Sequence, residues 1–255
     1  MTRPRRFDIL WAEGGGFLAG IEKNLWRAAR GGGAMRREDA APFFPMLRGM
    51  GGALVARLAG EFEEAAVRDM LTRADEAFQA NVPSIPEVGA DNPWLKSLVG
   101  VAWLSGVWLQ LEKRGWSLPR ISLATQKALA AFAQSSLPAE KRSAMGAAMC
   151  SPELAEKIAA RSRERRFPDD WLVEAVLPRE GESFDVGYDV FRCPVVQYLE
   201  ERGLRRFAAW FCRDDYPLHA AMGVRLERTR TLADGADRCD FRLKLCEEPF
   251  TQIME

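Results

Sequence analysis

The last fifth of the chain concentrates side chains that can take part in chemistry. Two runs of alternating residues, 224–232 and 238–246, flank the connection Ala233–Asp237, a pattern that predicts a β-hairpin. Among its reactive and hydrogen-bonding groups are a thiol, a carboxylate, two hydroxyls and three guanidinium groups: Cys239, Asp240, Thr229, Thr231, Arg228, Arg230 and Arg242. A thiol or carboxylate of shifted pKa acts as nucleophile or base, and a guanidinium holds a carboxylate through two hydrogen bonds. The hairpin is therefore the first candidate for a site.

The strand register decides which of these groups share a face. With Arg230 opposite Asp240, one face carries the thiol and the threonines, and the other carries an ion-pair ladder of the arginines and the aspartate. A one-residue bulge near Gly235 instead places Arg228 and Arg230 beside Cys239. The sequence leaves both registers open.

The first 165 residues are expected to be helical, because apolar residues recur there at intervals of three and four. The predicted helices are one around Leu18–Trp26, a longer one after Pro42 and Pro45 that includes Val67–Phe78, one from Pro93 to Lys113, and three over 119–136, 138–149 and 151–165. Ser151 followed by Pro152 is typical of a helix start.

After residue 165 the period changes from helical to alternating. Strands are predicted over Trp171–Leu177 and Phe184–Val190, and helices from Pro194 to Glu201 and from Leu204 to Cys212, before the closing hairpin. The fold class is therefore α+β: a helical N-terminal part packed on a C-terminal antiparallel sheet of at least four strands, with a helical crossover. We expect the two regions, 1–165 and 166–255, to form one compact unit.

Composition narrows the function classes. The 36 basic and 36 acidic side chains cancel, which gives no electrostatic reason to expect nucleic acid or a membrane surface as a partner. The most apolar stretch, Ser97–Leu109, is too short to span a bilayer, and no signal peptide is recognisable. We therefore expect a cytoplasmic protein. The eight tryptophans suit either a deep core or a homo-oligomer interface.

Histidine and cysteine usage argues against a metal site or a cofactor. His219 is the single histidine of the chain, which excludes a site built from several histidines and weakens a Ser-His-Asp or Cys-His interpretation. The five cysteines include no C-x-x-C pair and are expected to be free thiols. Cys150 and Cys246 are predicted to be buried packing residues.

Taken in order, a set of motifs in the final eighty residues resembles the L-2-amino-thiazoline-4-carboxylic acid hydrolase family. The matching pieces are Pro168 and Trp171, Cys193, Tyr198, Gly203-Leu204, Cys212, Asp215-Tyr216, Leu226-x-Arg228-Thr229-x-Thr231, Gly235, and Cys239-Asp240-Phe241-Arg242. The chain departs from the family pattern at Arg213-Asp214, where the family has Asn-Arg, and around Ala220–Gly223, where a glycine is displaced.

The resemblance implies hydrolysis of a carbon–nitrogen bond outside the peptide class, and the single histidine makes a metal-independent reaction the expectation. The family substrate is a cyclic isothiourea that carries a carboxylate and is opened to a carbamoyl-cysteine, which implies a place in cysteine metabolism. A carboxylate favours the cationic form of such an amidine, and nearby arginines would lower the pKa of a thiol. The predicted catalytic residues are Cys239, Asp215 and Cys193, and the predicted substrate-binding residues are Arg228, Thr229, Thr231, Asp240 and Arg242.

Three interpretations compete. The first is the hydrolase of cyclic amidines. The second is a non-catalytic module that binds a small molecule, because the strand, helix and Cys-x-Phe ending also resemble ligand-binding domains of the 4-vinyl reductase type. The third is an enzyme of the same family that acts on a different heterocycle in a specialised pathway, which the departure at Arg213-Asp214 favours.

Overall fold

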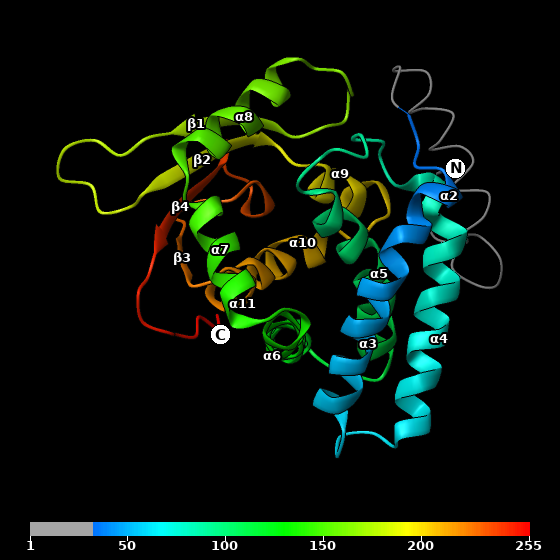
Figure 1. Cartoon of the computed structure of the whole chain (residues 1–255). Helices are drawn as coiled ribbons and strands as arrows, with labels where there is room; N and C mark the ends of the chain where they lie inside the picture. Colours follow the sequence, from blue (N-terminus) through cyan, green and yellow to red (C-terminus); the bar gives the residue numbers. More distant parts are fainter. Residues whose placement is uncertain (1–32) are drawn as a thin grey trace, which may run out of the picture.

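The computed structural model describes residues 33–255. The helical part contains α2 (Arg37–Ala40), η1 (Ala41–Phe43), α3 (Phe44–Leu58), α4 (Glu64–Asn81), η2 (Val82–Ser84), α5 (Leu95–Lys113), α6 (Leu118–Ser136), α7 (Ala139–Met149) and α8 (Pro152–Arg163). The remainder contains β1 (Leu172–Val176), β2 (Val186–Arg192), α9 (Pro194–Glu201), α10 (Arg205–Phe211), η3 (Cys212–Asp214), α11 (Asp215–Ala221), β3 (Val224–Glu227), η4 (Leu232–Asp234) and β4 (Cys239–Leu245). Figure 1 shows the sheet at one end of the molecule and α3, α4 and α5 at the other, with α9 and α10 between them. The helix expected around Leu18–Trp26 lies outside the described residues.

Local sequence signals place several helices where they were predicted. The apolar helix α5 ends before Gly115, whose φ of +82° is left-handed and is reached by glycine at little steric cost. Helix α8 begins at Pro152, and the Ser151 hydroxyl accepts a hydrogen bond from the N–H of Leu154 at 3.4 Å.

The stretch after Pro45 forms two helices rather than one long helix. Helix α3 ends at Leu58, α4 begins at Glu64, and Gly60 between them has a φ of +85°. A left-handed residue cannot continue a right-handed helix, so the chain turns back here. Helix α3 then packs against α6, and α4 against α5.

Four strands form one antiparallel sheet in the order β1-β2-β4-β3. Helices α9, α10 and α11 lie in the connection from β2 to β3, which confirms the α+β class and the helical crossover. Val190 faces Cys239 and Leu226 faces Leu243, and all four side chains are buried on the inner face of the sheet.

The closing hairpin is shorter than the sequence predicts. Strand β3 ends at Glu227, which faces Arg242. The prediction of paired strands up to Leu232 with a five-residue connection is therefore wrong. The longer connection contains the single-turn helix η4, which the alternating pattern of the sequence concealed.

Of the backbone pairing predicted between Arg230 and Asp240, one bond of 3.4 Å is present, outside the regular ladder. The register of β3 differs from that pairing by one residue, so the chain slips between Glu227 and Arg230. Continuing the β3 register puts Arg228 on the inner face, on the side of Cys239. The bulged alternative is therefore correct for Arg228 but wrong for Arg230, which is 45% exposed and pairs with Asp237 at 3.4 Å. The irregularity also lies before Arg230 rather than near Gly235.

One hydrophobic core joins the helices to the sheet. The Trp108 indole of α5 stacks on the Phe211 ring of α10 at a centroid distance of 3.9 Å, and Trp94 makes an edge contact with Tyr188 of β2 at 5.6 Å. Within residues 33–255, no helix is both long and apolar enough to cross a membrane.

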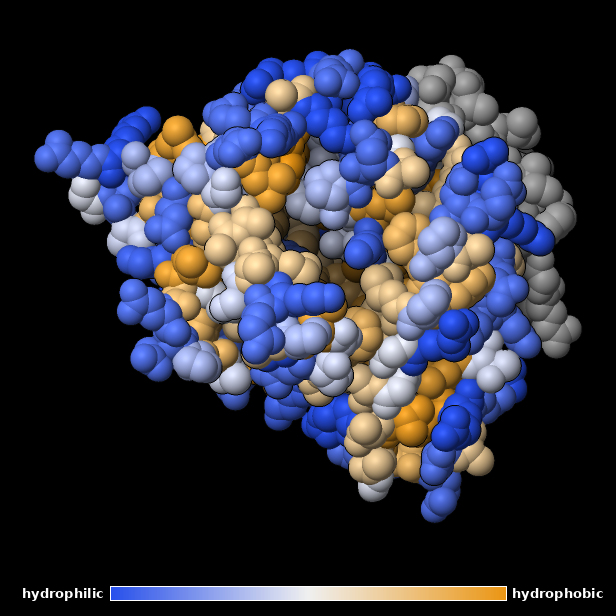
Figure 2. All heavy atoms as spheres, in the orientation of Figure 1, coloured by the Kyte–Doolittle hydropathy of each residue, from blue (hydrophilic) through white to orange (hydrophobic). Residues whose placement is uncertain are grey.

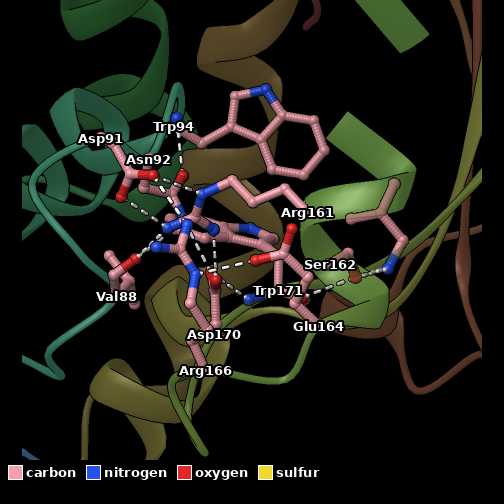
Figure 3. Close-up of polar contacts among 11 residues, drawn as sticks. Val88, Asp91, Asn92, Trp94, Arg161, Ser162, Glu164, Arg166, Asp170 and Trp171 are labelled. Atoms are coloured by element: carbon pink, nitrogen blue, oxygen red, sulfur yellow. Dashed lines mark hydrogen bonds and ion pairs between the residues drawn. The ribbon is translucent and has the colours of Figure 1, made fainter. Parts of the chain in front are cut away.

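A buried guanidinium ties the helical part to the start of the sheet. Arg161 of α8 donates to the carboxylates of Asp91 at 3.1 Å and Asp170 at 2.5 Å, and to the carbonyl of Val88 at 2.7 Å. The Asn92 amide also donates to Asp170, at 2.6 Å. Figure 3 shows these groups converging around the guanidinium. The loop before α5, helix α8 and the entry to β1 are thereby held together.

Candidate functional site

Residues from distant parts of the chain meet at the inner edge of the sheet. Cys193 precedes α9, Cys212 begins η3, Asp215 begins α11, Arg228 follows β3 and Cys239 begins β4. The Asp215 carboxylate pairs with Arg228 at 2.9 Å and raises the pKa of all three thiols. We call these five residues the thiol–carboxylate cluster. Four of them were predicted site residues, and Cys212 joins them although a core role was the alternative for it.

Helical spacing brings Cys212, Asp215 and His219 to one side of the η3–α11 segment. Residues separated by three and four positions lie on the same face of a helix, and this spacing is a sequence signal that could have placed Cys212 beside Asp215. The His219 ring nitrogen Nδ1 lies 2.6 Å from the carbonyl oxygen of Asp215. Burial lowers the pKa of His219, which favours the neutral imidazole.

Arg228 is the buried charge of the cluster. Its side chain is 2% exposed, and it donates to Oδ2 of Asp215 at 2.9 Å and to the carbonyl of Cys212 at 2.6 Å. The guanidinium lies between the rings of Tyr216 and Phe241, at 5.1 and 4.7 Å from their centroids. Burial alone would lower the pKa of Arg228, but Asp215 and the neighbouring acidic groups raise it above its ordinary value. The arginine is a fixed positive charge behind Asp215.

The three thiols of the cluster are stabilised in their protonated form. Burial raises the pKa of Cys193 to about 12, that of Cys212 well above its usual range, and that of Cys239 in the same direction. Arg228 lowers the pKa of Cys212 and of Cys239, but burial outweighs it. The expectation that nearby arginines leave a thiol of lowered pKa is therefore wrong here. Sγ of Cys239 accepts the N–H of Leu232 at 3.2 Å.

Asp215 is the charged member of the cluster that solvent reaches. Its side chain is 33% exposed, against 2% for Arg228. The cluster begins where α10 ends, and Figure 2 shows the surface hollowed over α10, between α7 and α3. The ion pair thus has a buried positive end and an accessible negative end.

The turn that follows Arg228 is held by one carboxylate. Oδ1 of Asp240 accepts the N–H groups of Thr229 at 2.9 Å and Arg230 at 2.8 Å, and Oδ2 accepts the Thr229 hydroxyl at 2.5 Å. These bonds replace strand pairing after Glu227. In the structure the Thr229 hydroxyl donates to the Asp240 carboxylate. The contacts predicted between these two residues and a substrate stay predictions.

The next residues are fixed in the same way. The Thr231 hydroxyl accepts the N–H of Asp234 at 3.0 Å and donates to its carboxylate at 2.6 Å, which caps η4. Arg205 of α10, which sequence reasoning missed, donates to the carbonyls of Leu232 at 2.8 Å and Ala233 at 2.6 Å. The substrate contact predicted for Thr231 likewise stays a prediction.

Arg242 lies on the outer face of the sheet, away from the cluster. It pairs with Asp189 of β2 at 3.0 Å, and Arg238 pairs with the same carboxylate at 2.9 Å. Gly187 faces Arg242 across the strands, and a Cβ there would lie 2.9 Å from the Arg242 side chain. A substrate contact by Arg242 stays a prediction, and its observed partner is a carboxylate of the sheet.

Asp214 is an acidic residue beside the cluster that sequence reasoning named only as a departure from the family pattern. It is 5% exposed, and neither carboxylate oxygen has a hydrogen-bond partner among the described residues. Burial raises the pKa of Asp214 well above its usual range, and Asp215 adds to that effect. The residue is therefore a buried acid that prefers to be neutral.

Across residues 33–255, no group of three or more histidine, cysteine or acidic side chains is arranged to hold a metal ion. The cluster therefore offers acid–base and hydrogen-bonding groups, namely one accessible carboxylate, neutral thiols and a neutral imidazole.

Comparison with known proteins identifies the C-terminal half. Residues 120–243 match the family model described as L-2-amino-thiazoline-4-carboxylic acid hydrolase, which confirms the resemblance found in the sequence. No curated protein and no solved structure matches the chain. The matched segment contains every member of the thiol–carboxylate cluster.

Proposed function

We propose that this chain, whose residues 120–243 match the family model described as L-2-amino-thiazoline-4-carboxylic acid hydrolase, hydrolyses a carbon–nitrogen bond of a small cyclic amidine or isothiourea. The single observation that carries this proposal is the Asp215–Arg228 pair, in which the arginine is buried and the carboxylate is accessible. An accessible carboxylate suits a protonated amidine, because it can accept charge-assisted hydrogen bonds from the amidine on the side away from Arg228.

The proposed reaction adds one water across the ring. Asp215 takes a proton from a water molecule as its oxygen attacks the carbon between the sulfur and the ring nitrogen. The resulting tetrahedral centre collapses, the carbon–nitrogen bond of the ring breaks, and the oxygen becomes a carbonyl. Both protons of the water end on the departing ring nitrogen, which leaves as an amine while the exocyclic amine stays on the carbamoyl product.

The protonated thiols favour activated water over a covalent intermediate. A nucleophilic cysteine reacts as its thiolate, and the raised pKa values of Cys193, Cys212 and Cys239 oppose that form at neutral pH. We assign these side chains to the wall of the site, where small polarisable groups pack against a ring that contains sulfur.

The test is ring opening of two related compounds, 2-aminothiazoline-4-carboxylate and 2-aminothiazoline. We expect a product heavier by one water from at least one of them, together with a new primary amine. Release of a free thiol instead would mean that the carbon–sulfur bond is cleaved. If the folded protein opens neither ring but is stabilised thermally by one of them, the binding-module interpretation replaces the hydrolase.

Two variants separate the chemical roles. Asp215→Asn should lose ring opening, whereas Cys239→Ala should retain most of it. Loss of activity in a folded Cys239→Ala variant, with a mass adduct on Cys239 in the wild type, would instead establish the covalent route. The alternative of a different heterocycle is tested with a panel of cyclic amidines in the same mass assay.

A further inference from the structure

Two carboxylates face each other across the outer side of the sheet. Asp189 of β2 lies directly opposite Asp240 of β4, and their side chains are 16% and 12% exposed. Like charges in a facing pair destabilise a sheet unless each one is compensated separately. The way in which each carboxylate is compensated therefore indicates its role.

The two residues are compensated by different partners. Asp189 is neutralised within the sheet by Arg238 and Arg242. Asp240 instead accepts three hydrogen bonds from the turn formed by Thr229 and Arg230. Burial acts to raise the pKa of Asp240, but the bonds from that turn outweigh it and lower the pKa. Asp240 is thus bonded to the turn in its ionised form.

This turn connects two members of the thiol–carboxylate cluster. Arg228 directly precedes Thr229, and Cys239 directly precedes Asp240. The Asp240 carboxylate therefore joins the segment that carries the buried guanidinium to the strand that carries the thiol. Without these bonds, nothing in the regular ladder fixes the chain after Glu227, where β3 ends.

We propose that Asp240 is a positioning residue, whose carboxylate holds the turn at Thr229 and Arg230 so that Arg228 is directed against Asp215. Its kinetic consequence rests on the proposed function, but its structural consequence does not. A loosened turn withdraws Arg228 from Asp215 and also releases the contact between Leu232 and the Cys239 thiol.

The experiment compares Asp240→Asn with Asp189→Asn in the full chain, two matched changes at facing positions. The first readout is the alkylation rate of Cys239 by iodoacetamide, followed by mass spectrometry, with buried Cys150 as the internal reference. We expect Asp240→Asn to raise the Cys239 to Cys150 ratio by about tenfold, as one charge-assisted hydrogen bond is lost. Asp189→Asn should leave that ratio unchanged.

The second readout uses a substrate that the wild type opens. Asp240→Asn should lower kcat with little change in KM, whereas Asp189→Asn should change neither. Thr229→Val, which removes the hydroxyl donor, should act in the same direction as Asp240→Asn, and Thr229→Ser should restore wild-type behaviour. This pair also provides the test if Asp240→Asn does not unfold cooperatively.

Equal Cys239 to Cys150 ratios in Asp240→Asn and Asp189→Asn would overturn the proposal. So would a Thr229→Ser variant that behaves like Thr229→Val. A wild type that opens no ring refutes the proposed function alone, because the alkylation ratio still decides the role of Asp240.

Discussion

Two buried arginines, Arg161 and Arg228, show how similar ion pairs serve different ends. Every guanidinium nitrogen of Arg161 donates to an acceptor, and its partner Asp170 is 10% exposed. Arg228 leaves Nε without a partner among the described residues, and Asp215 is 33% exposed. The bonds of Arg161 tie the loop before α5 to the entry of β1, which serves the fold. The Arg228 pair instead lies beside three thiols and keeps part of its carboxylate accessible, as a site requires.

The largest effect on activity is expected from Asp215, the carboxylate partner of Arg228. Asp215→Asn should lower kcat by about 100- to 10,000-fold, since it removes the proposed base. Its unfolding free energy should fall as well, because the Arg228 guanidinium, whose side chain is 2% exposed, is left without its carboxylate partner. Steady-state kinetics and urea unfolding on the same preparation check this. Undiminished kcat in the variant would remove Asp215 from the reaction.

Arg161→Met should lower stability without lowering kcat. It leaves the Asp170 carboxylate buried without its cation, which costs about 3–5 kcal/mol of unfolding free energy. We expect kcat per folded molecule to be unchanged, since the Arg161 contacts lie outside the thiol–carboxylate cluster. A large fall in kcat at full folding would show that the two regions are coupled.

The two regions should also respond to pH with opposite signs. Asp91, hydrogen-bonded to Arg161 and Arg166, has a pKa lowered to about 2. Its contribution to the unfolding free energy is therefore complete above about pH 4, the ordinary pKa of an aspartate, and is lost as the pH falls from about 4 to about 2. Asp214 has a raised pKa, so its folded form retains the proton and stability declines as the pH rises above about 4.

Urea unfolding from pH 2 to 8 tests both signs. Asp91→Asn should flatten the acid side of the stability profile, by a modest amount because the side chain is 58% exposed. Asp214→Asn should flatten the opposite slope. An Asp214→Asn profile parallel to the wild type would show that this acid is ionised at neutral pH in the folded protein.

The smallest effect is expected at the edge of the Arg161 network. Arg166 pairs with Asp91 at 2.9 Å, but the two side chains are 52% and 58% exposed. Arg166→Ala should therefore cost less than about 1 kcal/mol, an effect that high salt further reduces. A larger loss in thermal or urea unfolding would mean that Arg166 is required for the whole network.

The sequence predicts those parts of the fold that depend on neighbouring residues. Ser151-Pro152 and Cys193-Pro194 mark helix starts correctly, and the apolar run before Gly115 marks α5, because capping and periodicity are local signals. The end of β3 at Glu227 is not local. There the Asp240 side chain, eleven residues further along the chain than Thr229, takes the place of strand pairing. No pattern in the hairpin sequence predicts this contact.

In the candidate site, too, the sequence predicts which residues take part but not the properties that depend on tertiary packing. Family motifs select Cys193, Asp215, Arg228 and Cys239, and the structure brings them together. The protonation of the thiols could not be predicted, because it depends on burial by segments far away in the sequence. The burial of Asp214 depends on tertiary packing in the same way.

The stacking of Trp108 on Phe211 has a consequence for evolution and for protein engineering. Trp108 lies in α5, outside the segment matched by the family model, whereas Phe211 directly precedes Cys212. Helix α5 therefore helps to position the segment that begins at Cys212, and we expect substitutions at Trp108 and at Phe211 to depend on each other. A chimera that grafts residues 120–243 onto another helical partner would have to preserve the shape of this indole, or the carboxylate of Asp215 would be presented at the wrong angle.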